Sequence, residues 1–450
     1  MYTVDAANMK EIFDTYGAAE EYINATPKFT SKYSRENTER FWEHLGYPAR
    51  KSKVVHVAGT NGKGSVCAYL CSVLKKAGIS CGRFTSPHLL TMRERFVIDG
   101  DVVTEEEFLW AFRVVKEALA CLPQELAEAA YRPIFFEYLF FMAMVLFEKH
   151  GVEYVVLETG LGGRLDATNV VEEKELCILT SIGYDHMEYL GETLPEIAAE
   201  KAGILRKGVP VVYPDRQQQV SGVIEACARE IGAKTFPLKK TAIKEIKIKN
   251  KTIDFSLHLH YYDYIGFTVS TSALYQVENA SLAASALTLL QEERITLPVL
   301  QDGIRETFWE GRMEEIRPSV YVDGAHNVDG IRAFLETVEQ RSCAGRRMLL
   351  YSTVRDKQYQ EAAALLAGTA LFDEIFLTAL QNERALPLRQ LVDTFGQYTE
   401  IPTKAYDTLE TALKTLLGQK EERDEVYIVG SLYLVGEVKA LLRSLKDDQF

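Results

Sequence analysis

Short apolar runs that end abruptly in glycine and polar residues recur along this chain, and helix-like spacing follows most of them. Clear examples are residues 54–58, 154–158, 176–182 and 320–323. Continuous apolar runs of this length are typical of parallel strands that are buried on both faces. Their alternation with helical segments predicts an α/β fold, in which ligands bind at the carboxyl ends of the strands.

Helical and alternating patterns fill the stretches between these runs. Apolar spacing of about 3.6 residues predicts helices over 5–26, 34–45, 104–121, 133–149, 197–203 and 217–232, with Ser34 as an N-cap. Residues 242–270 alternate between apolar and polar positions, which predicts an antiparallel hairpin or meander. We interpret that segment as an edge elaboration whose residues indicate no chemistry.

The length of the chain requires more than one core. At 450 residues it exceeds a single ordinary domain. The polar stretch 292–298 ends in proline and predicts a linker, with the boundary near residue 298. We therefore expect a larger α/β domain over 1–298 and a smaller doubly wound, Rossmann-like α/β domain over 299–450.

Charge and composition narrow the possible partners. A net charge of −13 argues against nucleic-acid binding and means that an anionic substrate must be met by local basic groups. No window approaches about 18 uninterrupted apolar residues, so we expect no membrane span. The N-terminus carries no secretory pattern, and seven scattered cysteines without a C-x-x-C pair fit a reducing cytoplasm.

The glycine-rich turn after the first buried strand predicts a phosphate site. Its members are Gly59, Thr60, Asn61, Gly62, Lys63, Gly64 and Ser65. Glycines let backbone N–H groups curl around an anion, and the following helix adds partial positive charge. Lys63 would reach the outer phosphates and Ser65 could hold Mg²⁺. The spacing departs from the strict P-loop, because only two residues separate Gly59 from Gly62.

Two strand ends later in the chain carry further candidate ligands for Mg²⁺. Glu158 follows a buried strand directly and is a natural oxygen ligand for Mg²⁺. His186 follows the next buried run and would face the same crevice. The alternatives are a turn or capping role for Glu158 and a structural role for His186.

The segment 56–65 resembles the phosphate loop of the folylpolyglutamate synthase and dihydrofolate synthase branch of the Mur ligase family. The blocks 157–169 and 323–327 resemble that family closely as well, in order, and weaker matches extend the resemblance over nearly the whole chain. Departures include Met92, Phe96, Thr159, Val328 and Glu310, the last standing where the family usually has proline.

The resemblance implies further site residues. It makes Ser86 a Mg²⁺ ligand beside Ser65, Glu158 and His186, and it implies that Lys201 is a carbamate. It places Asn279, Arg312 and Asp323 on the nucleotide, His326 close to the reaction centre, and the step from Phe136 to Glu137 near a pterin pocket. From the residues alone, Asn279 could instead be an N-cap, Lys201 a helix-end lysine, and Phe135, Phe140 and Phe141 core residues.

The implied fold is a P-loop-containing Mur-ligase-like central domain plus the smaller C-terminal α/β domain, which closes on the nucleotide. The implied activity is ATP-dependent addition of L-glutamate to a folate, or to dihydropteroate, through an acyl phosphate. The cofactors would be ATP and two Mg²⁺ ions, and the enzyme would be a cytoplasmic monomer. A Mur-type ligase of peptidoglycan precursors and a P-loop kinase or NTPase are the alternatives.

Overall fold

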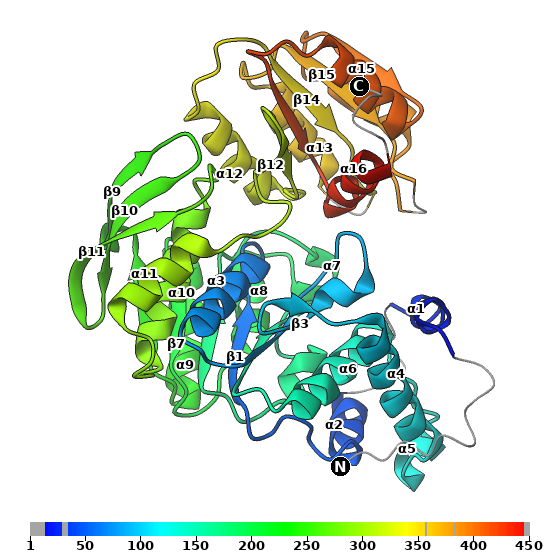
Figure 1. Cartoon of the computed structure of the whole chain (residues 1–450), viewed down its shortest axis with the longest axis vertical. Helices are drawn as coiled ribbons and strands as arrows, with labels where there is room; N and C mark the ends of the chain where they lie inside the picture. The colour runs from blue at the N-terminus through cyan, green and yellow to red at the C-terminus, as the bar shows by residue number, and fades with distance from the viewer. Residues whose placement is uncertain (1–13, 29–34, 356–357, 382–383, 445–450) are drawn as a thin grey trace.

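The chain forms two lobes, each built on its own mostly parallel sheet (Figure 1). The computed structural model describes residues 14–28, 35–355, 358–381 and 384–444. The first part of the helix expected over 5–26 and the N-cap Ser34 lie outside the described residues. Within the described ranges, the α/β fold predicted from the sequence is confirmed.

The larger lobe contains an eight-stranded sheet in the order β4-β3-β2-β5-β1-β6-β7-β8. Its strands are β1 (Lys53–Ala58), β2 (Cys81–Phe84), β3 (Phe96–Ile98), β4 (Asp101–Val102), β5 (Tyr154–Glu158), β6 (Leu176–Leu179), β7 (Val211–Asp215) and β8 (Thr235–Lys239). All pair in parallel except β3 and β4, which extend one edge as antiparallel strands. The predicted phosphate loop follows the central strand β1.

Helices cover both faces of this sheet. One face carries α1 (Tyr16–Asn24), α2 (Arg35–His44), α4 (Glu105–Ala120), α5 (Gln124–Glu128), α6 (Phe135–His150), α8 (Leu194–Ala202) and α9 (Gln218–Ile231), with the short α7 (Met187–Leu190) beside them. The other face carries α3 (Lys63–Lys76), α10 (Gln276–Leu289) and α11 (Leu297–Glu306). Short 3-10 turns are η1 (Met92–Arg95), η2 (Ala167–Val170) and η3 (Lys240–Ala242).

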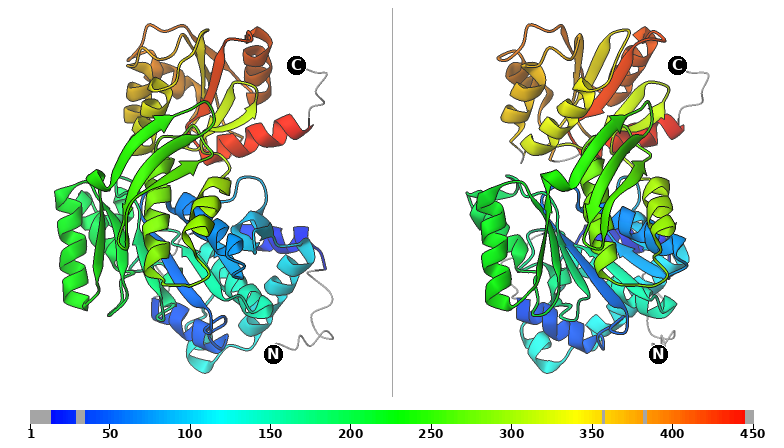
Figure 2. Two further views of the ribbon diagram at one scale, coloured as in Figure 1. Left: turned by 60° about the vertical axis from the view of Figure 1, so that its left-hand side comes forward. Right: turned by 90° about the vertical axis from the view of Figure 1, so that its left-hand side faces the viewer.

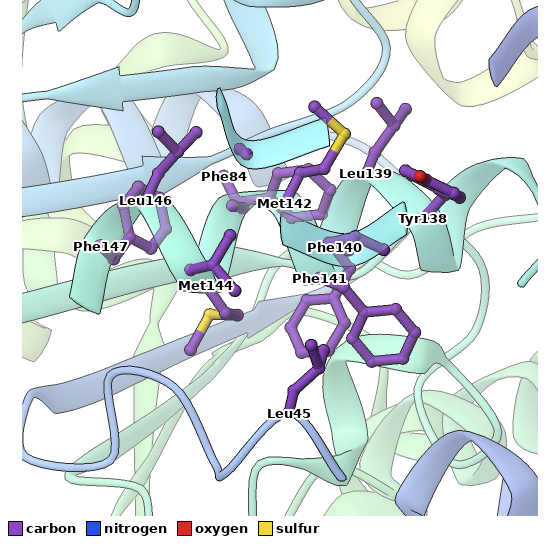
Figure 3. Packing of buried hydrophobic residues seen from close by; sticks show 14 of the residues in the cluster. Leu45, Phe84, Tyr138, Leu139, Phe140, Phe141, Met142, Met144, Leu146 and Phe147 are labelled. Carbon is purple, nitrogen blue, oxygen red and sulfur yellow. The ribbon is translucent and has the colours of Figure 1, made fainter. Parts of the chain in front are cut away.

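Helix α6 lies at the centre of one core (Figure 3). Eleven consecutive residues, from Glu137 to Phe147, are buried, and the aromatic rings pack against one another and against Phe84 of β2. A helix that is apolar on every side is expected only where protein surrounds it. The core interpretation of Phe140 and Phe141 is therefore correct.

A small antiparallel sheet stands beside the junction of the lobes (Figure 2). Its strands β9 (Ile243–Ile248), β10 (Ile253–Leu259) and β11 (Tyr262–Val269) have the order β11-β10-β9. Alternate residues of β10 are buried against α10 and α11, so the predicted antiparallel meander is confirmed.

The smaller lobe contains a six-stranded sheet in the order β12-β13-β17-β14-β15-β16, in which only β12 is antiparallel. Its strands are β12 (Glu314–Arg317), β13 (Val320–Asp323), β14 (Arg347–Tyr351), β15 (Glu374–Thr378), β16 (Thr403–Tyr406) and β17 (Glu425–Val429). Its helices are α12 (Val328–Glu339), α13 (Tyr359–Ala367) and α14 (Leu388–Phe395) on one face, and α15 (Leu409–Gln419) and α16 (Leu432–Ser444) on the other.

The stretch expected to be a linker leads directly into a helix. Residue 298 is the second residue of α11, which packs on α3 and on β11 of the larger lobe. The division at 298 stays a prediction, and the packing of α11 favours a boundary a few residues later. None of the described helices is both long and apolar enough to cross a bilayer.

Candidate active site

The glycine-rich turn forms a tight connection between β1 and α3. Gly59 and Gly62 have φ values of 153° and 89°, a region that favours glycine. A Cβ atom at Gly62 would collide with the Asn279 side chain. The N–H of Thr60 donates to the Ser181 carbonyl at 2.8 Å, which ties the turn to the end of β6.

Two lysines converge on this turn. Lys63 Nζ donates to the Gly59 and Thr60 carbonyls at 3.1 and 3.2 Å. Lys201 Nζ, from the end of α8, donates to the same Gly59 carbonyl at 2.7 Å. Burial lowers the pKa of Lys201 to about 7, and the positive charge of Lys63 acts in the same direction. With a pKa of about 7, a substantial fraction of this buried amine is neutral near pH 7, and a neutral amine is a nucleophile.

Glu158 lies at the carboxyl end of β5, as the sequence predicts. It is 3% exposed, and its Oε2 accepts a hydrogen bond from the Ser86 N–H at 3.0 Å. Its other carboxylate oxygen accepts none from the part of the chain that the structure describes. Burial raises the pKa of Glu158, while Lys63 and the Ser86 N–H oppose that shift. The capping alternative for Glu158 is not what the structure shows.

The loop after β2 holds Ser86 at this position. The carboxylate of Glu94 accepts three backbone N–H groups, from Leu89, Leu90 and Thr91, at 2.7–2.9 Å. This carboxylate fixes the turn that follows Ser86 without contributing to the pocket itself.

Most of the predicted chemistry lines one pocket of about 140 Å³, at the junction of the lobes. The pocket is lined by the turn, by residues of the larger lobe and by three residues of the smaller lobe: Gly59–Gly64, Ser86, Pro87, Glu158, Gly160–Gly162, Asp185, His186, Lys201, Arg312, His326 and Leu432. The structure therefore brings Lys63, Lys201 and His326 together with three of the four predicted metal ligands. Ser65 lies apart from them, in the adjoining cavity.

The adjoining cavity has a volume of about 500 Å³ and also lies between the lobes. Asn279 lines it from within α10, so Asn279 is no N-cap; the helix begins three residues earlier. Gln276 accepts a hydrogen bond from the Asn279 amide at 3.0 Å and donates to the Ser65 hydroxyl at 3.1 Å. This chain of hydrogen bonds connects α10 to the phosphate turn.

The small sheet, for which no chemistry was expected, contributes to this cavity. Ile243 and Ile246 of β9 line it, together with Lys240 and with Arg216 from the loop after β7. Ile246 is 46% exposed. The sequence contains one indication of this role, namely apolar residues on the outer positions of an edge strand. The sequence alone does not show which cavity these side chains face.

Asp323 is buried at the end of β13, with an exposure of 2%. Its carboxylate accepts hydrogen bonds from the Tyr275 hydroxyl at 2.5 Å, the Met313 N–H at 2.9 Å and the Ala325 N–H at 2.8 Å. Burial raises the pKa of Asp323 and Arg312 opposes the shift. Asp323 thus joins α10, the Arg312 loop and the loop after β13.

The two lobes meet through a reciprocal amide pair. Asn61 and Asn327 each donate to the other's side-chain oxygen at 3.0 Å. Asn327 also donates to Asp185 Oδ2 at 3.1 Å, and its side-chain oxygen caps α12 through the Gly330 N–H at 2.9 Å. Neither Asp185 nor Asn327 was singled out from the sequence, although both adjoin predicted histidines at strand ends.

His326 faces Asp185 across the junction. Its Nδ1 lies 2.8 Å from the Gly324 carbonyl oxygen, and its Nε2 lies 3.7 Å from Asp185 Oδ2. A ring nitrogen that faces a carbonyl oxygen must carry the proton. In the neutral ring Nε2 is then the acceptor, on the side of the pocket.

Asp166 organises the glycine-rich loop after β5. Its Oδ2 accepts the Gly160 and Leu161 N–H groups at 2.8 Å, and its Oδ1 accepts from the Thr168 hydroxyl at 2.5 Å. The buried His56 contacts that hydroxyl at 2.8 Å, and burial lowers the pKa of His56 well below its usual value. His56 is thus a neutral structural residue.

Glu137 has a structural explanation. Its carboxylate accepts hydrogen bonds from the Thr38 hydroxyl at 2.5 Å and from the Ile134 N–H at 2.9 Å, at the first turn of α6. Phe135 lies next to it, 5.3 Å below the Arg95 guanidinium. The suggested link of Glu137 to a pterin pocket stays a prediction, because these hydrogen bonds join its carboxylate to Thr38 of α2 and to Ile134 at the start of α6.

Among the described residues, no three His, Cys, Asp or Glu side chains converge as a self-contained metal site. Of the four predicted Mg²⁺ ligands, only Glu158 and His186 are of these residue types. The other two are the hydroxyl groups of Ser65 and Ser86. A Mg²⁺ ion that takes part of its shell from phosphate and water needs few protein ligands. The second oxygen of Glu158, in the pocket predicted to bind phosphate, fits that kind of site.

Comparison with known proteins identifies the family. Residues 138–287 match the Mur ligase middle domain and residues 311–432 match the Mur ligase, glutamate ligase domain. A dihydrofolate synthase/folylpolyglutamate synthase of Bacillus subtilis is 33% identical, over 96% of this chain and 100% of the relative. The chain belongs to the Mur ligase family, in its folylpolyglutamate synthase and dihydrofolate synthase branch.

Solved structures of this branch agree with the fold of the ligase. E. coli FolC in complex with DHPP and ADP has a TM-score of 0.83 and 26% identity, covering 96% of this chain and 98% of that one. Mycobacterium tuberculosis folylpolyglutamate synthase complexed with ADP has a TM-score of 0.87 and 25% identity, covering 95% and 98%. The predicted family and two-lobe Mur ligase fold are confirmed, whereas the role of each site residue stays a prediction.

Proposed function

We propose that this Mur ligase adds L-glutamate to a folate, or to dihydropteroate, at the expense of ATP. The observation that carries the proposal is the pocket of about 140 Å³, in which Lys63, Glu158 and Lys201 of one lobe face His326 of the other. The name of the Bacillus subtilis relative and the ADP complexes of the structural relatives support it.

The nucleotide occupies the adjoining cavity of about 500 Å³, with its phosphates on the turn from Gly59 to Ser65. Backbone N–H groups, Lys63 and Arg312 bind the phosphates, and Asn279 lies beside the turn. Asp323 contacts the nucleotide with its remaining acceptor capacity, since a carboxylate has about four lone-pair sites and three are used within the protein.

Ser86, Glu158 and His186 would hold one Mg²⁺ ion, to which a carbamate on Lys201 would add a further anionic ligand, and Ser65 would hold a second Mg²⁺ ion on the side of the adjoining cavity. Bound there, Mg²⁺ would neutralise charge on the transferring phosphoryl group. Lys201 suits this role because its amine is buried and its pKa is lowered to about 7, and carbamate formation consumes the neutral amine.

The reaction has two steps. A carboxylate oxygen of the folate attacks the γ-phosphorus of ATP, the bond to the β–γ bridging oxygen breaks, and ADP leaves. Lys63 offsets the charge of the group in transit. The amine of glutamate then attacks the acyl carbon, and inorganic phosphate leaves. His326 Nε2 and Asp185 face the pocket as acceptors and are positioned to orient the ammonium and take its proton.

Mutation of the turn and of the strand end tests the proposal. Lys63→Ala and Glu158→Ala should abolish glutamate-dependent phosphate release, because the first removes a positive charge at the γ-phosphate and the second removes a ligand of the Mg²⁺ that would neutralise it. Lys76→Ala is the matched control: it lies on the same helix but pairs with Glu306 at the surface. Near-normal turnover of either active-site variant contradicts the assignment.

A parallel assay with dihydropteroate, tetrahydrofolate and a UDP-linked peptidoglycan precursor separates the substrate classes. Phosphate release only with the UDP-linked compound would favour the other ligase class, and hydrolysis of ATP without any acceptor would favour an NTPase. We further propose that the enzyme acts in the cytoplasm as a monomer, without nucleic acid or membrane partners.

A further inference from the structure

Arg312 is surrounded in sequence by acidic residues and yet pairs with none of them. Glu310, Glu314 and Glu315 lie within three residues of it. Its guanidinium forms no ion pair with any residue in the described ranges, and its one hydrogen bond goes from Nη1 to the Gly311 carbonyl at 3.2 Å. The same side chain lines both the reaction pocket and the nucleotide cavity. An arginine with three glutamates within three residues of it in the sequence has several possible partners for a charge-assisted hydrogen bond.

A buried lysine occupies two of these carboxylates. Lys439 lies on α16, and its side chain is 8% exposed. Its Nζ donates to Glu310 Oε2 at 2.8 Å and to both oxygens of Glu314, at 2.8 and 3.0 Å. Glu314 Oε2 also accepts the Gly311 N–H at 2.7 Å. Both acids therefore turn toward Lys439 on α16: Glu314 through both of its carboxylate oxygens, and Glu310 through one.

The third carboxylate is held from the small sheet. Lys251, in the turn between β9 and β10, donates to Glu315 Oε2 at 2.7 Å, and the Ser319 N–H donates to Glu315 Oε1 at 3.1 Å. Burial pushes the pKa of Glu315 upward, but these hydrogen bonds hold it below its usual value. Glu315 is thus ionised and engaged away from Arg312.

The backbone on either side of Arg312 is fixed as well. The Gly311 carbonyl accepts the Gly324 N–H at 2.8 Å, and the Met313 N–H donates to Asp323 at 2.9 Å. These two hydrogen bonds fix the backbone from which the Arg312 side chain extends, so the direction of its guanidinium depends on which neighbouring groups attract it.

We propose that Lys439, assisted by Lys251, is a positioning residue that keeps these three glutamates occupied and so leaves Arg312 free for the phosphates of the nucleotide. The inference rests on the proposed function, because it requires a nucleotide in the cavity that Arg312 lines. Lys251 and Lys439 lie far apart in the sequence, and both would affect phosphate binding without contacting the nucleotide.

The test measures ADP affinity of the full chain by calorimetry. Lys439→Met releases Glu310 and Glu314 toward Arg312, and ADP should bind at least about tenfold more weakly, the loss expected of one charge-assisted contact. Adding Glu310→Gln and Glu314→Gln to that variant should restore affinity to within about threefold. Lys414→Met is the control, because its partner Glu410 lies on the exposed face of α15.

Unchanged ADP affinity in folded Lys439→Met overturns the proposal, and so does a loss that the two glutamine substitutions fail to restore, which indicates a packing role. If Lys439→Met does not fold, Lys251→Met at the surface carries the test: weaker binding supports the proposal and unchanged binding overturns it. The proposed function fails in a different experiment: the wild-type protein would then bind ADP but release no phosphate in the presence of folate and glutamate.

Discussion

The state of Lys201 depends on its burial. On a surface its amine would be protonated at neutral pH, but in the fold it lies against Lys63 and the Gly59 carbonyl, and its pKa falls to about 7. The sequence alone suggested a helix-end lysine, and only the resemblance to the Mur ligases pointed to a carbamate. The structure supplies the physical reason, because desolvation favours the neutral amine that adds CO₂.

We expect a carbamate signal in the ¹³C NMR spectrum of the protein in labelled bicarbonate. The amine is mostly protonated below pH 7 and mostly neutral above it, so the signal should grow as the pH rises from about 6 to about 8. Lys201→Arg should remove the signal, and Lys207→Arg, on an exposed loop near the same helix, should not. A signal of equal size in Lys201→Arg would exclude this lysine as the modified residue.

The sequence correctly predicted the pocket of those residues whose position follows from the end of a single strand. Glu158, His186 and Lys63 line the expected pocket because parallel strands bring their carboxyl ends to one edge. Tyr275, Gln276 and Asp185 were missed, because their roles depend on contacts between segments that are far apart in sequence.

At the scale of elements, α6 illustrates an ambiguity that a sequence cannot resolve. A glutamate within an aromatic segment is consistent with a ligand pocket or with a helix cap. In the structure Glu137 caps the N-terminus of a helix whose middle eleven residues are buried, and it accepts a hydrogen bond from Thr38 of α2. Buried carboxylates need partners, but the identity of the partner comes only from tertiary packing.

Glu137→Ala should lower the free energy of unfolding by about 1–3 kcal/mol, because it leaves the Thr38 hydroxyl and the Ile134 N–H without an acceptor. Urea denaturation measures this change. Glu128→Ala, at the exposed end of α5, should stay close to wild type. A Glu137→Ala protein of full stability with impaired folate binding would instead favour the pterin-pocket hypothesis.

At the scale of the whole molecule, the lobes are joined at the phosphate turn itself. The amide pair between Asn61 and Asn327, extended to Asp185, links the turn to the first helix of the smaller lobe. The sequence predicted two α/β domains that close on a nucleotide, but it could not show which side chains meet. The succession of strands and helices along the chain can be read from local apolar spacing, whereas the contact between the lobes joins residues far apart in the sequence.

Asn327→Asp should weaken this contact, because it sets a second carboxylate against Asp185 and removes the donor to Asn61. We expect a larger radius of gyration by small-angle scattering in the absence of nucleotide, and a smaller difference from wild type with ADP bound. Asn24→Asp, at the exposed end of α1, is the control. Identical scattering of Asn327→Asp and wild type would show that the amide pair does not hold the lobes together.

The strand β9 belongs to a sheet of its own and contributes to neither lobe's main sheet. Its side chains Ile243 and Ile246 nevertheless form part of the wall of the larger cavity. The wall and the glycine-rich turn therefore stand on different sheets, although they line the same cavity. A compound that fills the larger cavity would contact both surfaces, whereas a compound confined to the glycine-rich turn would contact only the end of the eight-stranded sheet.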